Sequence, residues 1–188
     1  MPLLRALSLP ALGLLLVACG TTTTERLKLP PLETVSSVDL ERYSGTWYEI
    51  AAFPQRFQEG CTDTTATYEP REDGEIDVTN RCRKDGELDT TEGRARVVDP
   101  ETRAKLEVSF FPLIWGEYWI IDLSPDYRWA VVGHPSRDYL WILSRTPTLD
   151  EGVLQGIQNR LDEKGYRLER LIMTPQSAAD DDSSQGAR

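Results

Sequence analysis

Residues 43–51 read Tyr-Ser-Gly-Thr-Trp-Tyr-Glu-Ile-Ala and open the first of a series of short segments with the pattern of β-strands. Such alternating or β-branched segments recur at the spacing typical of an all-β barrel or sandwich. Short turn signals such as Lys84-Asp85-Gly86 separate them, so the series predicts an antiparallel up-and-down meander. Eight strands closed on themselves leave room for packed side chains or one small ligand. The predicted strands are 45–53, 62–69, 75–83, 90–98, 104–111, 117–123, 128–133 and 139–144.

One helix is predicted after the eighth strand, followed by a short strand at 166–172. Thr148 and Glu151 have the spacing of a capping box, and Gly165 is typical of a helix C-terminus. Because only one face of the helix is apolar, we expect it to pack outside the barrel. Its apolar stripe consists of Leu149, Val153, Leu154, Ile157 and Leu161.

The N-terminus predicts export and lipid attachment. Residues 1–18 combine one charge, Arg5, with an apolar run of about a dozen residues, which suits a signal peptide and is too short for a membrane span. Leu16-Val17-Ala18-Cys19 resembles a lipobox, which implies cleavage before Cys19 and a lipid anchor on its sulfur. Gly20 follows it, and the resemblance then implies delivery to the outer membrane. The alternative is an ordinary secretory signal with a chance cysteine.

The rest of the chain suggests one folded domain with flexible ends. Residues 19–37 contain a threonine run and Pro30-Pro31 and are predicted as a stalk, 38–175 as the domain, and 176–188 as a disordered acidic tail. The 188 residues carry a formal net charge of −10, which keeps the chain soluble and argues against nucleic-acid binding. It also argues against adsorption to anionic lipid, so membrane attachment would depend on the anchor.

With Cys19 assigned to lipid, two cysteines remain, an even number suited to an oxidising periplasm. A turn centred between Arg71 and Glu72 would place Cys61 directly opposite Cys82 on adjacent antiparallel strands. Side chains opposed in this way are close enough for a disulfide. The alternatives are a metal pair or a redox centre, although no second Cys or His cluster supports them.

Three motifs occur in a fixed order along the predicted strands. Gly45-Thr46-Trp47 opens the first, Asp126-Tyr127 lies between the sixth and seventh, and Arg145 ends the eighth. Together with the stretches 43–51 and 137–147, they resemble the signature motifs of lipocalins, in particular the bacterial lipocalins of the outer membrane. The resemblance covers about residues 38–174. It implies an eight-stranded lipocalin barrel in which Trp47 plugs the closed end and Arg145 lies over its indole as a cation–π pair.

Alternation from Trp47, aligned strand by strand through the resemblance, predicts which side chains face the lumen, Ala51 among them. This lumen is apolar and aromatic with a few polar groups, as in small-molecule pockets, and the alternative is a fully packed core. Glu49 would be costly there unless it meets a polar ligand group, a cationic side chain or a wet opening. The predicted ligand contacts are Glu49, Ala66, Tyr68, Val78, Asn80, Val108, Phe110, Tyr118, Ile120, Val132, Tyr139 and Trp141.

Residues 110–116 read Phe-Phe-Pro-Leu-Ile-Trp-Gly and are predicted as an unusually apolar loop at the open end. Exposed apolar segments often mark contact surfaces. Three interpretations stand for this one: a lip for entering lipid, a membrane-touching tip, or a contact in a homodimer.

The sequence predicts a binding protein without a cofactor or metal site. His134 is the only histidine and lies in a turn, and no motif of a hydrolase, metalloprotease or phosphate-binding loop occurs. The resemblance implies a lipid ligand, such as a fatty acid or lysophospholipid, bound for storage, transport or salvage at the periplasmic side of the outer membrane. The alternatives are a periplasmic isomerase or de-epoxidase acting on lipid, and a packed barrel that serves as an interaction module.

Overall fold

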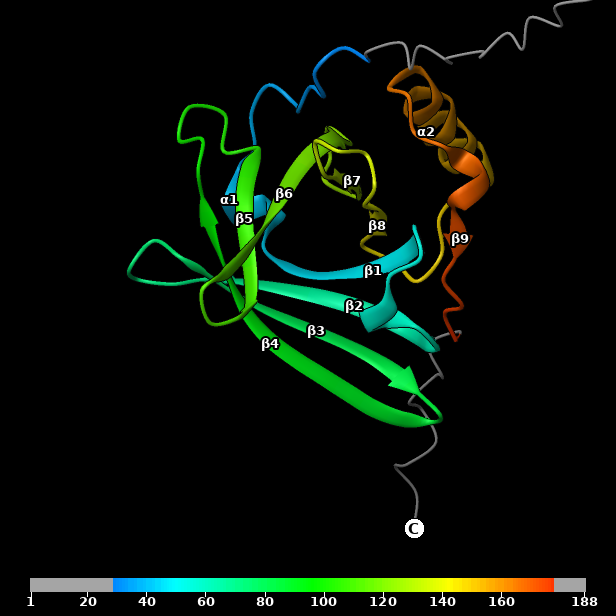
Figure 1. The fold of residues 1–188 in the computed structure, drawn as a ribbon, viewed down its shortest axis with the longest axis horizontal. Coiled ribbons are helices and arrows are strands. Elements are labelled where there is room, and N and C mark those ends of the chain that lie inside the picture. Colours follow the sequence, from blue (N-terminus) through cyan, green and yellow to red (C-terminus); the bar gives the residue numbers. More distant parts are fainter. Residues whose placement is uncertain (1–28, 178–188) are drawn as a thin grey trace, which may run out of the picture.

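The computed structural model describes residues 29–177, which form a closed antiparallel barrel with one long helix outside it (Figure 1). Each strand pairs with the next, and β1 pairs with both β2 and β8, which closes the barrel. This arrangement confirms the predicted eight-stranded meander. The strands are β1 (Gly45–Ala52), β2 (Cys61–Pro70), β3 (Ile76–Lys84), β4 (Glu87–Val97), β5 (Lys105–Phe111), β6 (Ile114–Leu123), β7 (Trp129–Gly133) and β8 (Leu140–Ser144).

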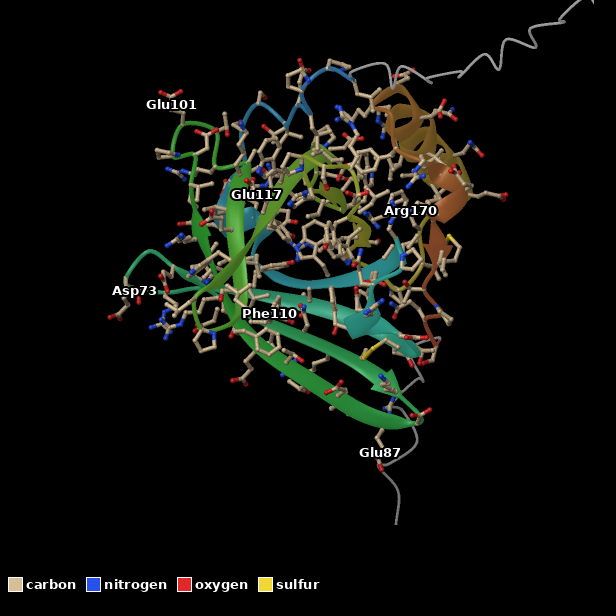
Figure 2. All side chains as sticks on the ribbon, in the orientation of Figure 1. Asp73, Glu87, Glu101, Phe110, Glu117 and Arg170 are labelled. Carbon is tan, nitrogen blue, oxygen red and sulfur yellow. A yellow bond between two sulfur atoms is a disulfide. The ribbon has the colours of Figure 1, made fainter. Side chains whose placement is uncertain are left out.

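Helix α2 (Glu151–Glu163) packs against the outer wall of the barrel, as predicted. Its buried residues Ile157 and Leu161 belong to an apolar cluster with β-strand side chains such as Val131. The predicted capping box is wrong, because Asp150 is the N-cap and its carboxylate accepts a hydrogen bond from the backbone N–H of Val153. Short connections join neighbouring strands, and Figure 2 labels Asp73 and Glu101 in two of them and Glu87 at the start of β4.

Four short elements complete the fold: α1 (Leu40–Tyr43), η1 (Arg56–Gln58), η2 (Leu168–Arg170) and β9 (Ile172–Met173). The predicted short strand after the helix is confirmed, but its predicted bounds, 166–172, are wrong, because the 3₁₀ turn η2 lies in the middle of that segment. Only β9 is extended there, and it pairs with the end of β1. None of the helices within residues 29–177 is long and apolar enough to cross a membrane. The predicted signal peptide, Cys19 and the last part of the tail lie outside the described residues.

A β-bulge in β1 changes which side chains face inward. Glu49 pairs with Leu143 and Ala51 with Ile142, so Ile50 is an extra residue in the ladder. The alternation predicted from Trp47 therefore fails after Glu49. Ala51 was predicted to face the lumen, and instead it packs in the outer cluster beneath α2.

Cys61 and Cys82 form the predicted disulfide, with their Cα atoms 5.5 Å apart. The predicted register is wrong, because Cys61 pairs with Lys84 and lies diagonal to Cys82. The β2–β3 turn is centred at residue 73, later in the chain than predicted, since its first ladder pair is Pro70 and Ile76. A bulge between Thr62 and Thr65 then gives β2 an additional residue opposite Cys82, which brings the diagonal cysteines together.

The apolar segment 110–116 is a tight hairpin, so the predicted loop is wrong. Phe111 pairs with Ile114, and Leu113 takes a positive φ of 69° in the turn between them. The side chains of Phe111, Leu113 and Ile114 are 68%, 96% and 67% exposed. The hairpin therefore presents a solvent-exposed apolar tip.

Candidate ligand-binding cavity

Trp47 and Arg145 close one end of the barrel. Trp47 is fully buried, and its Nε1 donates to the carbonyl oxygen of Tyr43 over 2.7 Å. The Arg145 guanidinium carbon lies 3.7 Å from the indole centroid, which is the stacking predicted from the sequence. The same guanidinium donates to the carbonyl oxygens of Arg42, Tyr43 and Thr46. One arginine thus connects α1 and β1 to the end of β8.

The predicted Asp126-Tyr127 motif holds the same end from the other side. Tyr127 has a φ of 62°, and its hydroxyl accepts a hydrogen bond of 2.8 Å from the backbone N–H of Asp39, the N-cap of α1. The Arg42 guanidinium lies 4.0 Å from the Tyr127 ring centroid. Asp126 accepts a hydrogen bond from the backbone N–H of Arg128 and shapes the turn. The motif residues therefore have structural contacts at the closed end.

Above this plug the barrel encloses a cavity of about 400 Å³. Its walls come from η1 and from all the barrel strands except β4, and they are mostly apolar and aromatic. All the side chains predicted to contact a ligand border it except Ile120, which is fully buried in the packed core of the closed end. The residues that border it are Glu49, Phe57, Gln58, Thr64, Thr65, Ala66, Tyr68, Val78, Asn80, Val108, Phe110, Ile114, Gly116, Glu117, Tyr118, Val132, His134, Tyr139, Trp141 and Leu143.

Sequence reasoning missed several of these residues for identifiable reasons. Phe57 and Gln58 come from the 3₁₀ turn η1 between β1 and β2, where no two-residue alternation exists to reveal an inward side. The consecutive residues Thr64 and Thr65 both border the cavity, because the bulge between Thr62 and Thr65 interrupts the alternation of β2 there. The hydroxyl of Thr64 is buried and has no hydrogen-bond partner among the described residues.

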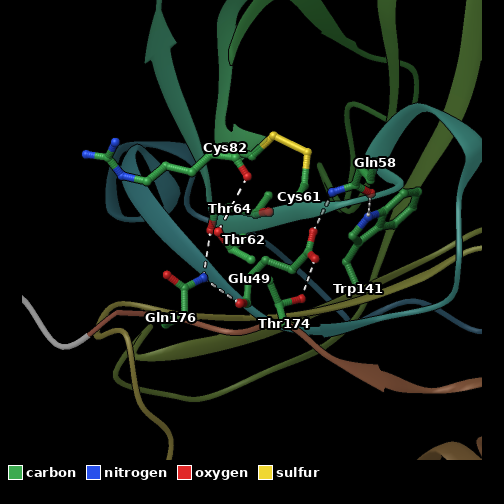
Figure 3. The surroundings of a disulfide bond; sticks show 10 residues. Glu49, Gln58, Cys61, Thr62, Thr64, Cys82, Trp141, Thr174 and Gln176 are labelled. Carbon is green, nitrogen blue, oxygen red and sulfur yellow. Dashed lines mark hydrogen bonds between the residues drawn. A yellow bond between two sulfur atoms is a disulfide. The ribbon is translucent and has the colours of Figure 1, made fainter. Parts of the chain in front are cut away.

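Glu49 is 7% exposed and is bound by the protein's own neutral donors (Figure 3). Gln58 Nε2 donates to one carboxylate oxygen over 2.7 Å, and the Thr174 hydroxyl donates to the other over 2.5 Å. Gln58 Oε1 in turn accepts from Trp141 Nε1 over 3.1 Å. Burial raises the pKa of Glu49, and the hydrogen bonds from Thr174 and Gln58 oppose this shift. Among the described residues, none of these partners is cationic.

The C-terminal segment closes a seam between β1 and β2. Their ladder ends at the pair Tyr48 and Thr65, beyond which the two strands diverge. Gln176 Nε2 bridges the gap by donating to the carbonyl oxygens of Glu49 and Thr64, over 2.8 and 3.0 Å (Figure 3). The sequence predicted that the disordered tail begins at Gln176. In the structure this residue bonds to β1 and β2.

Three tyrosines meet at the bottom of the cavity. The hydroxyl oxygens of Tyr43 and Tyr118 are 2.7 Å apart, and those of Tyr68 and Tyr118 are 2.8 Å apart. Burial raises the pKa of all three hydroxyls, that of Tyr68 to about 12, so all are neutral at pH 7. The floor of the cavity is therefore polar but uncharged.

The cavity can desolvate an apolar chain and offers few groups for other chemistry. Of the described residues that border it, none is lysine or arginine. Within residues 29–177 no group of three or more His, Cys, Asp or Glu side chains could hold a metal ion. His134 accepts a hydrogen bond at Nδ1 from the backbone N–H of Ser136, which is a contact within its own turn.

A closed eight-stranded barrel with an internal cavity, an arginine-capped tryptophan plug and one outer helix defines a class of binding barrels. The family model for a Lipocalin-like domain matches residues 38–176, and the chain belongs to the lipocalin family. The resemblance noted in the sequence is thereby confirmed.

Curated relatives and solved structures agree with this assignment. The outer membrane lipoprotein Blc of Escherichia coli is 40% identical over 178 residues, which cover 94% of this chain and 98% of Blc. Temperature-induced lipocalin-1 of Arabidopsis thaliana is 43% identical, covering 78% of this chain and 83% of the relative. Among solved structures, insecticyanin from Manduca sexta has a TM-score of 0.65 at 23% identity, covering 80% and 87% of the two chains, which shows the shared fold.

Proposed function

We propose that this protein is a membrane-anchored lipocalin that binds single-chain lipophilic ligands, such as fatty acids or lysophospholipids, in its cavity. The observation that carries the proposal is the cavity of about 400 Å³ with largely apolar and aromatic walls. This cavity argues against the alternative of a fully packed barrel that serves only as an interaction module. Phe57, Ile114 and Tyr139 border the cavity and are also solvent-exposed, so they mark its mouth.

The affinity would come from removing an acyl chain from water. Burial contributes about 0.8 kcal/mol per CH₂ group, so ten methylenes supply about 8 kcal/mol before the cost of ordering the chain. A headgroup would stay at the mouth, near exposed side chains. This arrangement suits storage, transport or salvage of envelope lipids.

The proposed location is the outer membrane, facing the periplasm. The lipobox-like Leu16-Val17-Ala18-Cys19 and the similarity to outer membrane lipoproteins named Blc both support it. The disulfide between Cys61 and Cys82 suits the oxidising periplasm. The acidic surface leaves attachment to the lipid on Cys19.

We propose binding in preference to catalysis by an isomerase or de-epoxidase. Both oxygens of Glu49, the buried carboxylate at the cavity, accept hydrogen bonds from the protein itself. His134 bonds within its turn. The protein's own atoms thus engage both groups, which supports a passive cavity.

Native mass spectrometry tests the proposal. The protein without its anchor, a chain that begins at Thr21, is expected to carry a lipid through a gentle purification. Added lysophospholipid is expected to change the fluorescence of Trp141, which borders the cavity. Absence of both signals would contradict the proposal, and conversion of the lipid by the domain would favour the enzyme.

A further inference from the structure

The floor of the cavity joins three hydroxyl groups from distant parts of the chain. Tyr43 comes from α1, Tyr68 from β2 and Tyr118 from β6. The rings of Tyr68 and Tyr118 border the cavity. Tyr43 lies beneath them and packs on Trp47, with ring centroids 5.0 Å apart. We call these three residues the tyrosine floor.

Counting protons shows that the tyrosine floor has a hydrogen-bond donor to spare. Each neutral hydroxyl carries one proton, so three protons serve the two hydrogen bonds that link the hydroxyls. If the third proton stays on Tyr43, it is buried without an acceptor among the described residues, which is costly. If it lies on Tyr68 or Tyr118, it can be offered to the cavity. Rotation of the hydroxyls alone switches between these arrangements.

The surroundings determine which acceptor suits this donor. None of the described residues that border the cavity is lysine or arginine, whereas two of them, Glu49 and Glu117, are carboxylates. An anion at the floor would therefore lack a counter-charge and would meet carboxylates along the wall. An uncharged oxygen has no such cost, and a chain of hydrogen-bonded hydroxyls polarises its last donor favourably.

We propose that the tyrosine floor is a specificity site for an uncharged oxygen, a hydroxyl or carbonyl, at the end of the ligand that enters first. The inference rests on the proposed function and deepens it. The protein then binds oxygenated acyl chains at least as tightly as plain hydrocarbon chains of equal length. A wholly apolar floor would do the opposite, since it leaves the oxygen of the ligand unpaired.

The test compares fatty acids with and without a terminal hydroxyl. The probes are hexadecanoic and 16-hydroxyhexadecanoic acid, with the matched pairs of 12 and 14 carbons to vary how deep the chain reaches. The protein is the chain from Cys19 onwards with Cys19→Ser, and its tryptophan fluorescence reports binding. At one chain length or more, we expect the hydroxylated acid to bind as tightly as the plain acid or more tightly. An unpaired hydroxyl would weaken binding about tenfold.

Variants locate the effect. The double variant Tyr68→Phe/Tyr118→Phe removes both cavity-facing hydroxyls. In it, the affinity for the hydroxylated acid should fall about five- to tenfold relative to the affinity for the plain acid. Tyr166→Phe is the matched control, because Tyr166 packs in the outer cluster away from the cavity and its buried hydroxyl has no hydrogen-bond partner among the described residues. Tyr43→Phe should also keep the preference, because two hydroxyls with one mutual bond still have a spare proton.

The outcomes separate the two proposals. If no fatty acid binds at any length, the proposed function fails. If the plain acids bind while the hydroxylated acids are tenfold weaker at every length in the unmutated barrel, the tyrosine floor is not a specificity site. The same conclusion follows if the double variant weakens both probes equally, or if Tyr43→Phe removes the preference. The comparison in the unmutated barrel stands even if the double variant does not fold.

Discussion

Arg145 connects several parts of the closed end through one side chain. Its guanidinium stacks on Trp47 and donates to the backbone carbonyls of Arg42, Tyr43 and Thr46. We expect Arg145→Ala to lower the free energy of unfolding by about 2–4 kcal/mol, because three carbonyls each lose a hydrogen bond and the indole loses its cation.

Urea unfolding measures this effect. Arg145→Lys is the informative control, since lysine keeps the charge but carries its donors on one nitrogen and lacks the planar fork that stacks on the indole while donating to several carbonyls. We expect it to recover only part of the loss. A change below about 0.5 kcal/mol for Arg145→Ala, which is typical of ordinary surface positions, would contradict the assigned role.

Glu49 makes stability depend on pH in a predictable direction. Burial raises its folded-state pKa above the ordinary value of 4.5. As pH rises from that value through the raised pKa, the unfolded chain releases the proton first, so stability falls. Below the ordinary pKa this penalty is absent. Glu49→Gln removes the titration, and its free energy of unfolding should rise relative to the unmutated protein as pH goes from 4 to 8.

Chemical unfolding at several pH values measures the difference between the two proteins, so that titrations elsewhere cancel. Gln offers the same oxygen to Gln58, while the Thr174 hydroxyl can turn to accept from the new amide. A difference that stays constant with pH, or that changes in the opposite direction, would show that Glu49 has an unshifted or lowered pKa.

Among the elements, the C-terminal segment acts as a missing piece of the β1–β2 ladder. Gln176 donates to the carbonyls of Glu49 and Thr64, where β1 and β2 no longer pair with each other. The backbone N–H of Asp63 donates to the carbonyl of Pro175. We expect Gln176→Ala to lower the free energy of unfolding by about 1–2 kcal/mol, because two partly buried acceptors lose their donor. Gln155→Ala on the exposed face of α2 is the matched control and should change stability by less than about 0.5 kcal/mol. Equal effects of the two substitutions would show that the seam needs no closure.

The disulfide ties β2 to β3 next to the same seam. Cys61 and Cys82 are 21 residues apart in sequence, and a loop of this length predicts a stabilisation of about 3 kcal/mol. Reduction should therefore lower the urea midpoint of the unmutated protein. The double variant Cys61→Ala/Cys82→Ala should start from the lower midpoint and be insensitive to reductant. A midpoint that does not respond to reduction would show that the native strand pairs already fix this loop.

For the whole molecule, the barrel wall separates two apolar clusters with different tasks. The outer cluster fixes α2 against the wall, and the inner cluster packs the closed end around Trp47. The remaining interior stays open as the cavity. Stability is thus supplied by the outer face and the plug, which leaves the upper lumen free for a ligand.

This division predicts that the cavity can be filled without loss of the fold. Ala66 borders the cavity and pairs with Trp47 across the β1–β2 ladder. We expect Ala66→Trp to weaken binding of 1-palmitoyl-lysophosphatidylcholine at least about tenfold, because the indole takes the space of the chain. Isothermal titration measures the affinity, and Thr46→Trp, on the exposed side of β1, is the control. Unchanged affinity of Ala66→Trp would place the ligand outside the barrel.

The sequence by itself determined the strand order, the closed end and the disulfide partners. Each depends on a short pattern: alternation within a strand, the motif residues Trp47 and Arg145, and an even number of cysteines once Cys19 is set aside. Local patterns of this kind survive in the fold because neighbouring residues on a strand keep their spacing. For the same reason most of the cavity wall could be predicted.

Only the tertiary structure decided the details that depend on an extra residue or a distant partner. The bulge at Ile50 shifts the end of β1 by one position and turned Ala51 outward, and the bulge near Asp63 shifts β2 locally so that Cys61 lies diagonal to Cys82. Alternation has no signal for such an insertion. The donors to Glu49, the bridge by Gln176 and the three hydroxyls of the tyrosine floor come from segments far apart in the chain. They meet only when the barrel closes, because closure is what brings β1 against both β2 and β8.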